Sequence, residues 1–200
     1  DLIVKSDLML EMSGQRIIPD EGNGWNFTAL RDINFYLQYS HNCTDVNARN
    51  RYDGVARFFR AYFYFEKVKR YGDIPWYDKA LDSDDPDLYK ARDSREFVMQ
   101  KMLSDLDFAI TNLPKTKNAY ILTRWTALAL KSRVCLFEGT FRKYHGLEDY
   151  EKYLDACVSA SETFMNESGY TLYKSGSTPY RDLFASMNLQ ADEIIFGRDY

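Results

Sequence analysis

A strongly aromatic segment constrains the fold of this chain more than any other feature. Residues 56–77, ARFFRAYFYFEKVKRYGDIPWY, carry seven aromatic side chains between Phe58 and Tyr71. Their spacing has the period of an amphipathic helix, which we expect over about 51–71. The apolar stripe is wide, so neighbours must cover this helix on more than one side. The expected apolar face comprises Phe58, Ala61, Tyr62, Phe65 and Val68, and the opposite side Arg57, Arg60, Tyr64 and Lys67.

This helix has a clear end and is followed by a long connection. Gly72 comes directly after the last periodic residue, and Pro75 lies three residues further on; both are usual helix stop signals. The next stretch, YDKALDSDDPDLYKARD at 77–93, is acidic and contains one proline. It therefore predicts a surface loop.

Three more helices are expected, at 94–113, 123–139 and 150–167. Asp93 precedes the first of them, with a glutamate three residues later in a capping-box pattern, and Thr123 is a favourable cap for the second. The short connection between the last two helices predicts an antiparallel hairpin. The small residues within 127–132 permit a neighbouring helix to approach closely.

These elements predict an all-α fold of tetratricopeptide-like helical hairpins with long loops. No regular 34-residue sequence period is present. Minor short strands are expected at YTLY, 170–173, and DEIIF, 192–196, on either side of a helical turn at 178–184. We expect a single domain over 1–200, since 200 residues with 45% apolar side chains can bury one sizeable core.

Composition excludes several classes of function. The net charge is −4 with a pI near 5.3, which argues against nucleic-acid binding. No apolar run is long enough to span a membrane. The sequence contains no phosphate-binding or dinucleotide-binding glycine motif and no nucleophile elbow, so neither a cofactor nor a known catalytic motif is predicted.

Metal binding is also not predicted. His41 and His145 stand far apart, and the acidic run at 82–87 lacks the glycine and terminal glutamate of a calcium loop. The three cysteines have no metal-ligand spacing, and their odd number excludes complete internal pairing. Cys135 and Cys157 fall in apolar helical patterns and are expected to be buried free thiols.

The aromatic helix and the segments after it resemble the SusD/RagB-like family. The segment RFFRAYFYFEKVKRYGDIPW is similar to the family signature, in which an Arg-Ala pair, here Arg60 and Ala61, is followed by a Tyr-Gly-Asp-x-Pro stop at 71–75. The later segments at 94–114, 122–139, 150–173 and 192–196 resemble the family in the same order. The resemblance covers the chain from about Trp25 onward and places it in the N-terminal portion of a longer family member.

The resemblance implies a non-enzymatic, lipid-anchored protein exposed on the outer-membrane surface of Bacteroidetes-type bacteria. Such proteins capture oligosaccharides, or in some cases peptides, and deliver them to a SusC-like TonB-dependent transporter. The lipid anchor would lie outside this chain. The helices would form the scaffold, and loops would carry the ligand site.

A turn-rich segment before the aromatic helix is the leading candidate for that site. Sugar binding requires aromatic faces beside hydrogen-bonding groups. The segment PDEGNGWNF, 19–27, offers both, and the residues predicted to bind ligand there are Asp20, Asn23, Trp25 and Asn26. Trp76 and Tyr77, directly after the helix stop, are second candidates. The alternative for Trp25 is that it closes the edge of the core, and Trp125, inside a helix, is expected to be core.

Three questions stay open at this level. Either one of Arg57 and Arg60 bridges to an acidic neighbour within the fold, or the pair binds an anionic ligand or the transporter. The whole chain could instead be a helical-repeat adaptor that binds only proteins. It could also be a helical glycoside hydrolase, which would need two carboxylates at catalytic separation across a cleft.

Overall fold

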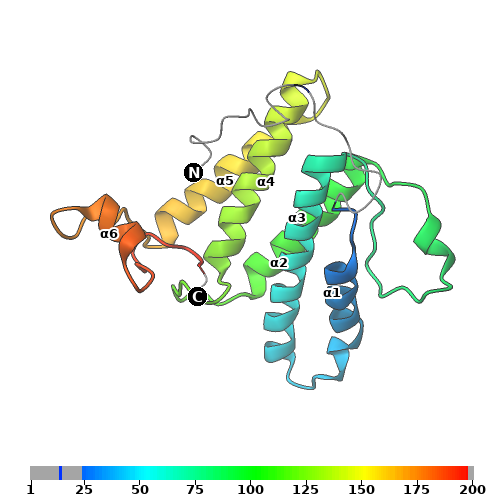
Figure 1. Cartoon of the computed structure of the whole chain (residues 1–200), viewed down its shortest axis with the longest axis horizontal. Helices are drawn as coiled ribbons and strands as arrows, with labels where there is room; N and C mark the ends of the chain where they lie inside the picture. The colour runs from blue at the N-terminus through cyan, green and yellow to red at the C-terminus, as the bar shows by residue number, and fades with distance from the viewer. Residues whose placement is uncertain (1–13, 15–23, 198–200) are drawn as a thin grey trace.

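The computed structural model describes residue 14 and residues 24–197, and its main helices pack in chain order with successive helices running in opposite directions (Figure 1). The helices are α1 (Thr28–Tyr39), α2 (Val46–Tyr71), α3 (Arg95–Asn112), α4 (Arg124–Tyr144), α5 (Tyr150–Glu167) and α6 (Pro179–Ala185), with short 3₁₀ turns η2 (Ser40–Asn42) and η3 (Pro86–Tyr89). The tightest pairs are α2 with α3 and α4 with α5. This arrangement confirms the all-α, tetratricopeptide-like prediction.

Local capping explains several helix ends. The Asp45 side chain accepts hydrogen bonds from two backbone N–H groups in the first turn of α2, which starts earlier than the predicted residue 51. Gly72 ends α2 with φ of 70°, and its N–H donates to the Val68 carbonyl. The Thr123 side chain accepts from Thr126 N–H and caps α4 as expected.

The predicted cap of α3 was wrong by one residue. Ser94, not Asp93, is the N-cap, and its hydroxyl accepts from Phe97 N–H at 3.3 Å. Asp73 accepts from Arg95 N–H at 2.8 Å, so a distant carboxylate serves the same helix end. Asp93 is occupied elsewhere, because its carboxylate accepts from Trp76 N–H at 2.7 Å.

The predicted end of α4 at Gly139 was also wrong, since the helix continues to Tyr144. Gly139 is not a stop signal but a contact point: a Cβ built there would lie 2.7 Å from Leu154 Cδ2. Ser132 Oγ and Ser161 Oγ lie 2.7 Å apart further along the same pair of helices. Small residues on α4 therefore let α5 approach closely, as their pattern predicts.

The buried and exposed faces of α2 differ from those that the apolar periodicity predicts. Tyr62, expected on the buried face, is 45% exposed, whereas Tyr64 is fully buried. Arg60, expected on the outer side, is buried as well. The core surrounds α2 on several sides, and Tyr64 and Arg60 satisfy their polar groups within it.

Two buried ion clusters connect the helices. The Arg60 guanidinium donates to both oxygens of Asp105 on α3, at 2.6 and 2.8 Å, and Arg57 lies 3.6 Å from the same carboxylate. The intramolecular alternative is therefore correct for both arginines. The fully buried Glu138 carboxylate accepts from Arg95 and Arg142 and joins α3 to α4.

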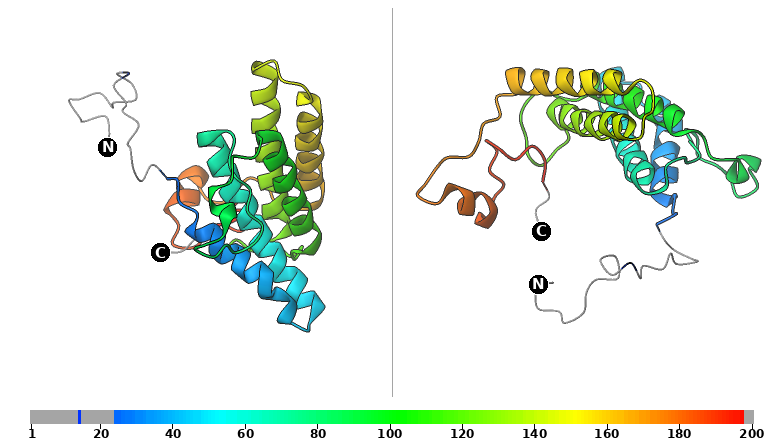
Figure 2. Two further views of the ribbon diagram at one scale, coloured as in Figure 1. Left: turned by 90° about the vertical axis from the view of Figure 1, so that its right-hand side faces the viewer. Right: turned by 90° about the horizontal axis from the view of Figure 1, so that it is seen from above.

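The segment after α5 lies beside the far end of the bundle from α1 (Figures 1 and 2). Lys117 Nζ donates to the Gly169 carbonyl, and Gly197 N–H donates to the Ala119 carbonyl at 2.8 Å. The strands predicted at 170–173 and 192–196 are not formed; a hydrogen bond from Thr171 N–H to the Asp192 carbonyl joins the two pieces without building a ladder. The predicted helical turn at 178–184 corresponds to α6.

The cysteines are free thiols in different environments. Cys135 is buried as expected, whereas Cys157, also expected to be buried, is only partly buried, and Cys43 is exposed. Burial raises the pKa of the Cys135 thiol to about 12. Trp125 is 4% exposed and belongs to the core, as expected.

Candidate functional site

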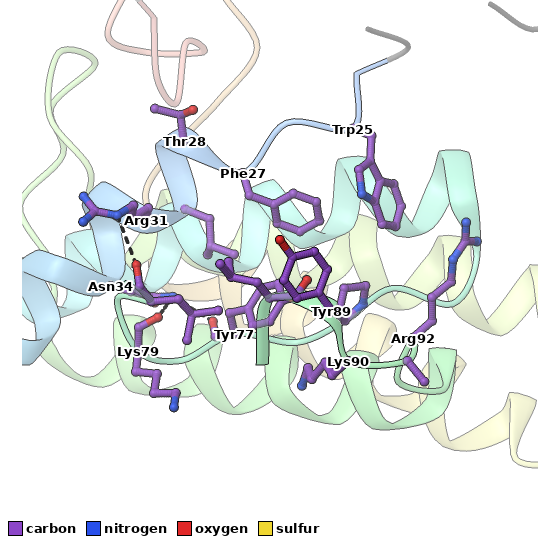
Figure 3. A pocket seen from close by; sticks show the side chains of 15 residues that line it. Trp25, Phe27, Thr28, Arg31, Asn34, Tyr77, Lys79, Tyr89, Lys90 and Arg92 are labelled. Carbon is purple, nitrogen blue, oxygen red and sulfur yellow. Dashed lines mark hydrogen bonds between the residues drawn. The ribbon is translucent and has the colours of Figure 1, made fainter. Parts of the chain in front are cut away.

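A cavity of about 610 Å³ opens between the start of α1 and the connection from α2 to α3 (Figure 3). Three short segments surround it: 25–34, 75–81 and 88–92. We call it the α1 pocket. Its lining residues are Trp25, Phe27, Thr28, Leu30, Arg31, Asn34, Pro75, Tyr77, Lys79, Leu81, Leu88, Tyr89, Lys90, Ala91 and Arg92.

The connection that forms one wall, residues 74–93, is closed at its base. Ile74 N–H donates to the Asp93 carbonyl at 3.2 Å in an antiparallel bridge. The Asp93 side chain adds the bond from Trp76 N–H and an ion pair with Lys90 at 2.8 Å. Burial acts to raise the pKa of Asp93, but the hydrogen bonds from Lys90 and Trp76 outweigh it and lower that pKa.

Tyr64 links this wall to the core of α2. Its hydroxyl donates to the Pro75 carbonyl at 3.2 Å and accepts from Tyr77 N–H at 2.6 Å. Its ring stacks on Trp76, with centroids 4.3 Å apart. Burial raises the pKa of Tyr64 well above its ordinary value, so the phenol stays protonated and keeps donating.

Asn34 on α1 holds the other side of the same wall. Its amide donates to the carbonyls of Tyr77 and Lys79, at 2.8 and 3.3 Å, and its carbonyl oxygen accepts from Arg60. Arg60 in turn is fixed by Asp105. A continuous chain of hydrogen bonds therefore runs from α3 through α2 and α1 to the pocket wall.

Aromatic side chains form a row along the α1 pocket. Trp25 is 43% exposed and meets Phe27 and Tyr71 edge to face, at 5.3 and 4.9 Å between centroids. Phe27 meets Tyr77 in the same way at 5.8 Å. Tyr89 also lines the pocket and is largely exposed (Figure 3). Such amphipathic rings can present flat apolar faces to a sugar while their edges stay fixed by one another.

The structure places only some of the predicted site residues in the lining of the α1 pocket. Trp25 and Tyr77 both line the α1 pocket. Asn26 does not line it; its side-chain oxygen accepts from Thr28 N–H at 2.8 Å and supports the start of α1. Asp20 and Asn23 lie outside the described residues, so their predicted role stays a prediction.

Trp76 occupies a separate position. Its ring is 5% exposed and lines a second, more polar cavity of about 590 Å³ with Arg60 and Asp105. Its indole nitrogen has no hydrogen-bond partner among the described residues. Trp76 therefore lies outside the lining of the α1 pocket.

Sequence reasoning missed several lining residues. Helix α1 was not predicted, and with it Phe27 and Arg31 were overlooked, although 28–39 has an amphipathic pattern that a helical-period search would detect. Tyr89 and Arg92 lie within the segment predicted as an acidic loop. Only the fold brings these two segments together.

The pocket lining limits the chemistry of the site. None of the fifteen lining residues that lie in the described part of the chain is a carboxylate, whereas a glycosidase requires a pair of carboxylates across the scissile bond. Within residues 24–197 no cluster of three or more metal-ligating side chains was found. Of the helices described, none has the length and apolar character needed to cross a membrane.

Comparison with known sequences places these observations in a family. A family model for SusD-like proteins, described as starch-binding and associating with the outer membrane, matches residues 21–124. SusD-like protein P38 of Formosa agariphila is 28% identical over 134 residues, which cover 67% of this chain and 24% of that protein. SusD-like protein P2 of the same organism is 34% identical over 101 residues, covering 50% of this chain and 20% of that protein.

Solved structures agree with this assignment. A SusD-like protein from Bacteroides fragilis has a TM-score of 0.71 at 26% identity, covering 86% of this chain and 32% of that one. A laminarin-binding SusD-like protein has a TM-score of 0.65 at 19% identity, covering 83% and 34% of the two chains, and shows the fold alone. A structure with a xylogluco-oligosaccharide, at 22% identity and a TM-score of 0.63, covers 79% and 30% and does the same.

The chain thus spans about a quarter or less of the curated relatives it matches and about a third of the solved structures. The matched region contains α1, α2, α3 and every residue that lines the α1 pocket. Because that match covers half of the sequence, the chain belongs to the SusD-like family.

Proposed function

We propose that this chain takes part in capturing oligosaccharides at the cell surface and delivering them to a SusC-like TonB-dependent transporter. The observation that carries the proposal is the α1 pocket with its aromatic row of Trp25, Phe27 and Tyr77. Sugar rings expose C–H faces that pack on aromatic rings and hydroxyl groups that need hydrogen-bond partners. The pocket offers both, since Asn34, Thr28 and several cationic groups lie among the rings.

Relatives of the chain support a glycan as the ligand. One neighbour is described as laminarin-binding, and another structure contains a xylogluco-oligosaccharide. We extend glycan binding to this chain because the family match includes the whole pocket. Peptides are a second ligand class to be tested beside glycans.

The proposed cellular location is the outer-membrane surface, with a lipid anchor outside this chain. The family description, which includes association with the outer membrane, supports this location. Capture of a large outer-membrane barrel by the full natural protein would support the transporter partnership. Recovery of other proteins without such a barrel would favour the helical adaptor instead.

The binding test compares matched aromatic variants on a glycan and peptide array. Trp25→Ala removes an exposed ring of the pocket, and Tyr144→Ala removes an exposed ring at the end of α4. Truncation of a central aromatic contact usually costs more than about 1 kcal/mol, so we expect roughly fivefold or greater loss of affinity for Trp25→Ala alone. Equal binding by the two variants would exclude Trp25 from the site.

Turnover assays separate the proposal from the hydrolase alternative. The captured oligosaccharide should be recovered intact after prolonged incubation with the full natural protein. Release of shorter sugars by the purified protein would favour the hydrolase. The absence of carboxylates from the described lining residues of the α1 pocket supports intact recovery.

A further inference from the structure

The charge of the α1 pocket is opposite to that of the chain. The sequence holds 30 acidic and 26 basic residues, for a net charge of −4. Among the described residues, the pocket lining nevertheless contains four cationic side chains, Arg31, Lys79, Lys90 and Arg92, and no carboxylate. This local excess of positive charge requires an explanation.

The two lysines are neutralised by the wall itself. Lys79 Nζ lies 3.2 Å from Asp85 and 3.0 Å from Asp87, and these contacts raise the pKa of Lys79. Lys90 Nζ pairs with Asp93 at 2.8 Å and donates to the Trp76 carbonyl at 2.7 Å. Both lysines therefore serve to hold the 74–93 wall together.

The two arginines have no such compensation. In the described part of the chain, no carboxylate lies within ion-pair distance of Arg31 or Arg92. Arg31 donates through Nε to the Leu81 carbonyl at 3.4 Å, which leaves its terminal nitrogens available. The Arg92 guanidinium lies 4.9 Å from the ring centroid of Trp25, so the ring orients it without neutralising it.

The placement of these arginines suits an extended ligand. Figure 3 shows Arg31 and Arg92 at opposite ends of the pocket, with Phe27, Tyr77 and Tyr89 between them. A guanidinium group is a planar fork that binds a carboxylate or a sulfate through two parallel hydrogen bonds. A neutral sugar has no anionic group that such a fork could bind.

We propose that the α1 pocket selects an acidic oligosaccharide, whose rings pack on the aromatic row while carboxylate or sulfate substituents bind Arg31 and Arg92. This inference rests on the proposed glycan-binding function and specifies the chemical class of its ligand. Uronic acids and sulfate esters share the anionic group that the arginines would recognise. The test must therefore distinguish these two sources.

The experiment is isothermal titration calorimetry of the full natural protein with paired saccharides. Oligogalacturonate is compared with its methyl ester, and carrageenan oligosaccharides with their desulfated forms, so each pair shares one backbone and differs in charge. We expect at least one acidic member to bind about tenfold or more tightly than its neutral partner. Its affinity should fall as salt is added, because salt screens exposed charges.

Charge-removing variants locate the effect. Arg31→Gln and Arg92→Gln should each weaken binding of the acidic saccharide about tenfold, and each should weaken binding of its neutral partner by a clearly smaller factor. Arg133→Gln is the matched control, since Arg133 is an exposed residue of α4 outside the pocket. Arg92→Lys keeps the charge but loses the fork and should bind with intermediate affinity.

The outcomes separate the inference from the function on which it rests. Equal affinity for charged and neutral partners, or unchanged affinity of both arginine variants for the acidic saccharide, would overturn the charge selectivity while glycan capture stands. Binding of neutral glycans on the array with no binding to any acidic saccharide of the panel would overturn the charge selectivity alone, and absence of binding to every saccharide of both the panel and the array would overturn both. Preference for the uronate or for the sulfate pair identifies the acidic group.

Discussion

Replacing Tyr64 with phenylalanine tests the link between the helical scaffold and the pocket wall. The substitution keeps the ring stacked on Trp76 and removes only the hydroxyl group. That hydroxyl accepts from Tyr77 N–H at 2.6 Å and donates to the Pro75 carbonyl at 3.2 Å, at a fully buried position. The variant therefore leaves two backbone groups without their partner.

The expected loss can be worked from these contacts. A hydrogen bond contributes about 0.5–1.5 kcal/mol net, and an orphaned buried group costs about 1–3 kcal/mol. Tyr77 is only partly buried, so water can replace part of the hydrogen bonding that its backbone N–H loses. We expect the free energy of unfolding to fall by about 2–3 kcal/mol, equivalent to roughly 4–12 °C in Tm for a chain of this size.

Urea denaturation followed by circular dichroism measures this loss. Tyr62→Phe is the control, because Tyr62 lies on the same helix and is 45% exposed; its change should stay within about 0.5 kcal/mol. Amide exchange at Tyr77 should quicken in Tyr64→Phe alone. If the two variants unfold at the same urea concentration, the hydroxyl does not hold the wall and the reasoning fails.

Three further predictions address packing, pH and thiol reactivity. Gly139→Ala should destabilise the protein by about 1–3 kcal/mol in the same urea assay, because the added Cβ would lie 2.7 Å from a Leu154 methyl carbon and 3.2 Å from its backbone nitrogen; an unchanged midpoint would mean that α4 and α5 separate freely. The pKa of Asp93 is lowered in the folded state, so its ionised carboxylate stabilises the fold above the ordinary carboxyl pKa. The free energy of unfolding should therefore exceed that of Asp93→Asn by about 1.5–3 kcal/mol at pH 6, and this difference should vanish as the pH falls through the folded-state pKa. A difference that stays constant with pH would contradict this. Because burial raises the pKa of the Cys135 thiol to about 12, Cys135 should react with Ellman's reagent at pH 8 far more slowly than the exposed Cys43 in the native protein. Cysteine-to-serine variants that keep only one of these two thiols measure each rate separately, and equal rates would show that Cys135 is not shielded.

The scaffold could be predicted from sequence where local signals act alone. The wide apolar stripe around Phe58 and the stop at Gly72 predict the central part and the C-terminal end of α2, because helical periodicity and glycine's positive φ are local properties. Gly139 shows where local reading fails. A glycine is both a helix stop and a site of close helix approach, and only the partner residue on α5 decides between the two.

The candidate site was predictable only in part. Trp25 and Tyr77 stood out by residue type, and both line the pocket. Arg31 and Arg92 did not, since each is an ordinary surface cation in its own segment. The role we propose for them depends on a long-range arrangement that brings α1 beside the 74–93 wall, and sequence spacing carries no information about this arrangement.

Because residues 74–93 are closed at their base, this wall is a segment that can be exchanged without altering the helices. Its ends are fastened to each other by the Ile74–Asp93 bridge and to α2 by the Tyr64 hydroxyl, while its middle carries Lys79, Tyr89 and Arg92. Doubling the length of a flexible loop costs only about 0.6 kcal/mol of closure free energy. Segments of other length and charge could therefore be grafted between the same two anchor residues, changing which ligand is held while the helices keep their packing.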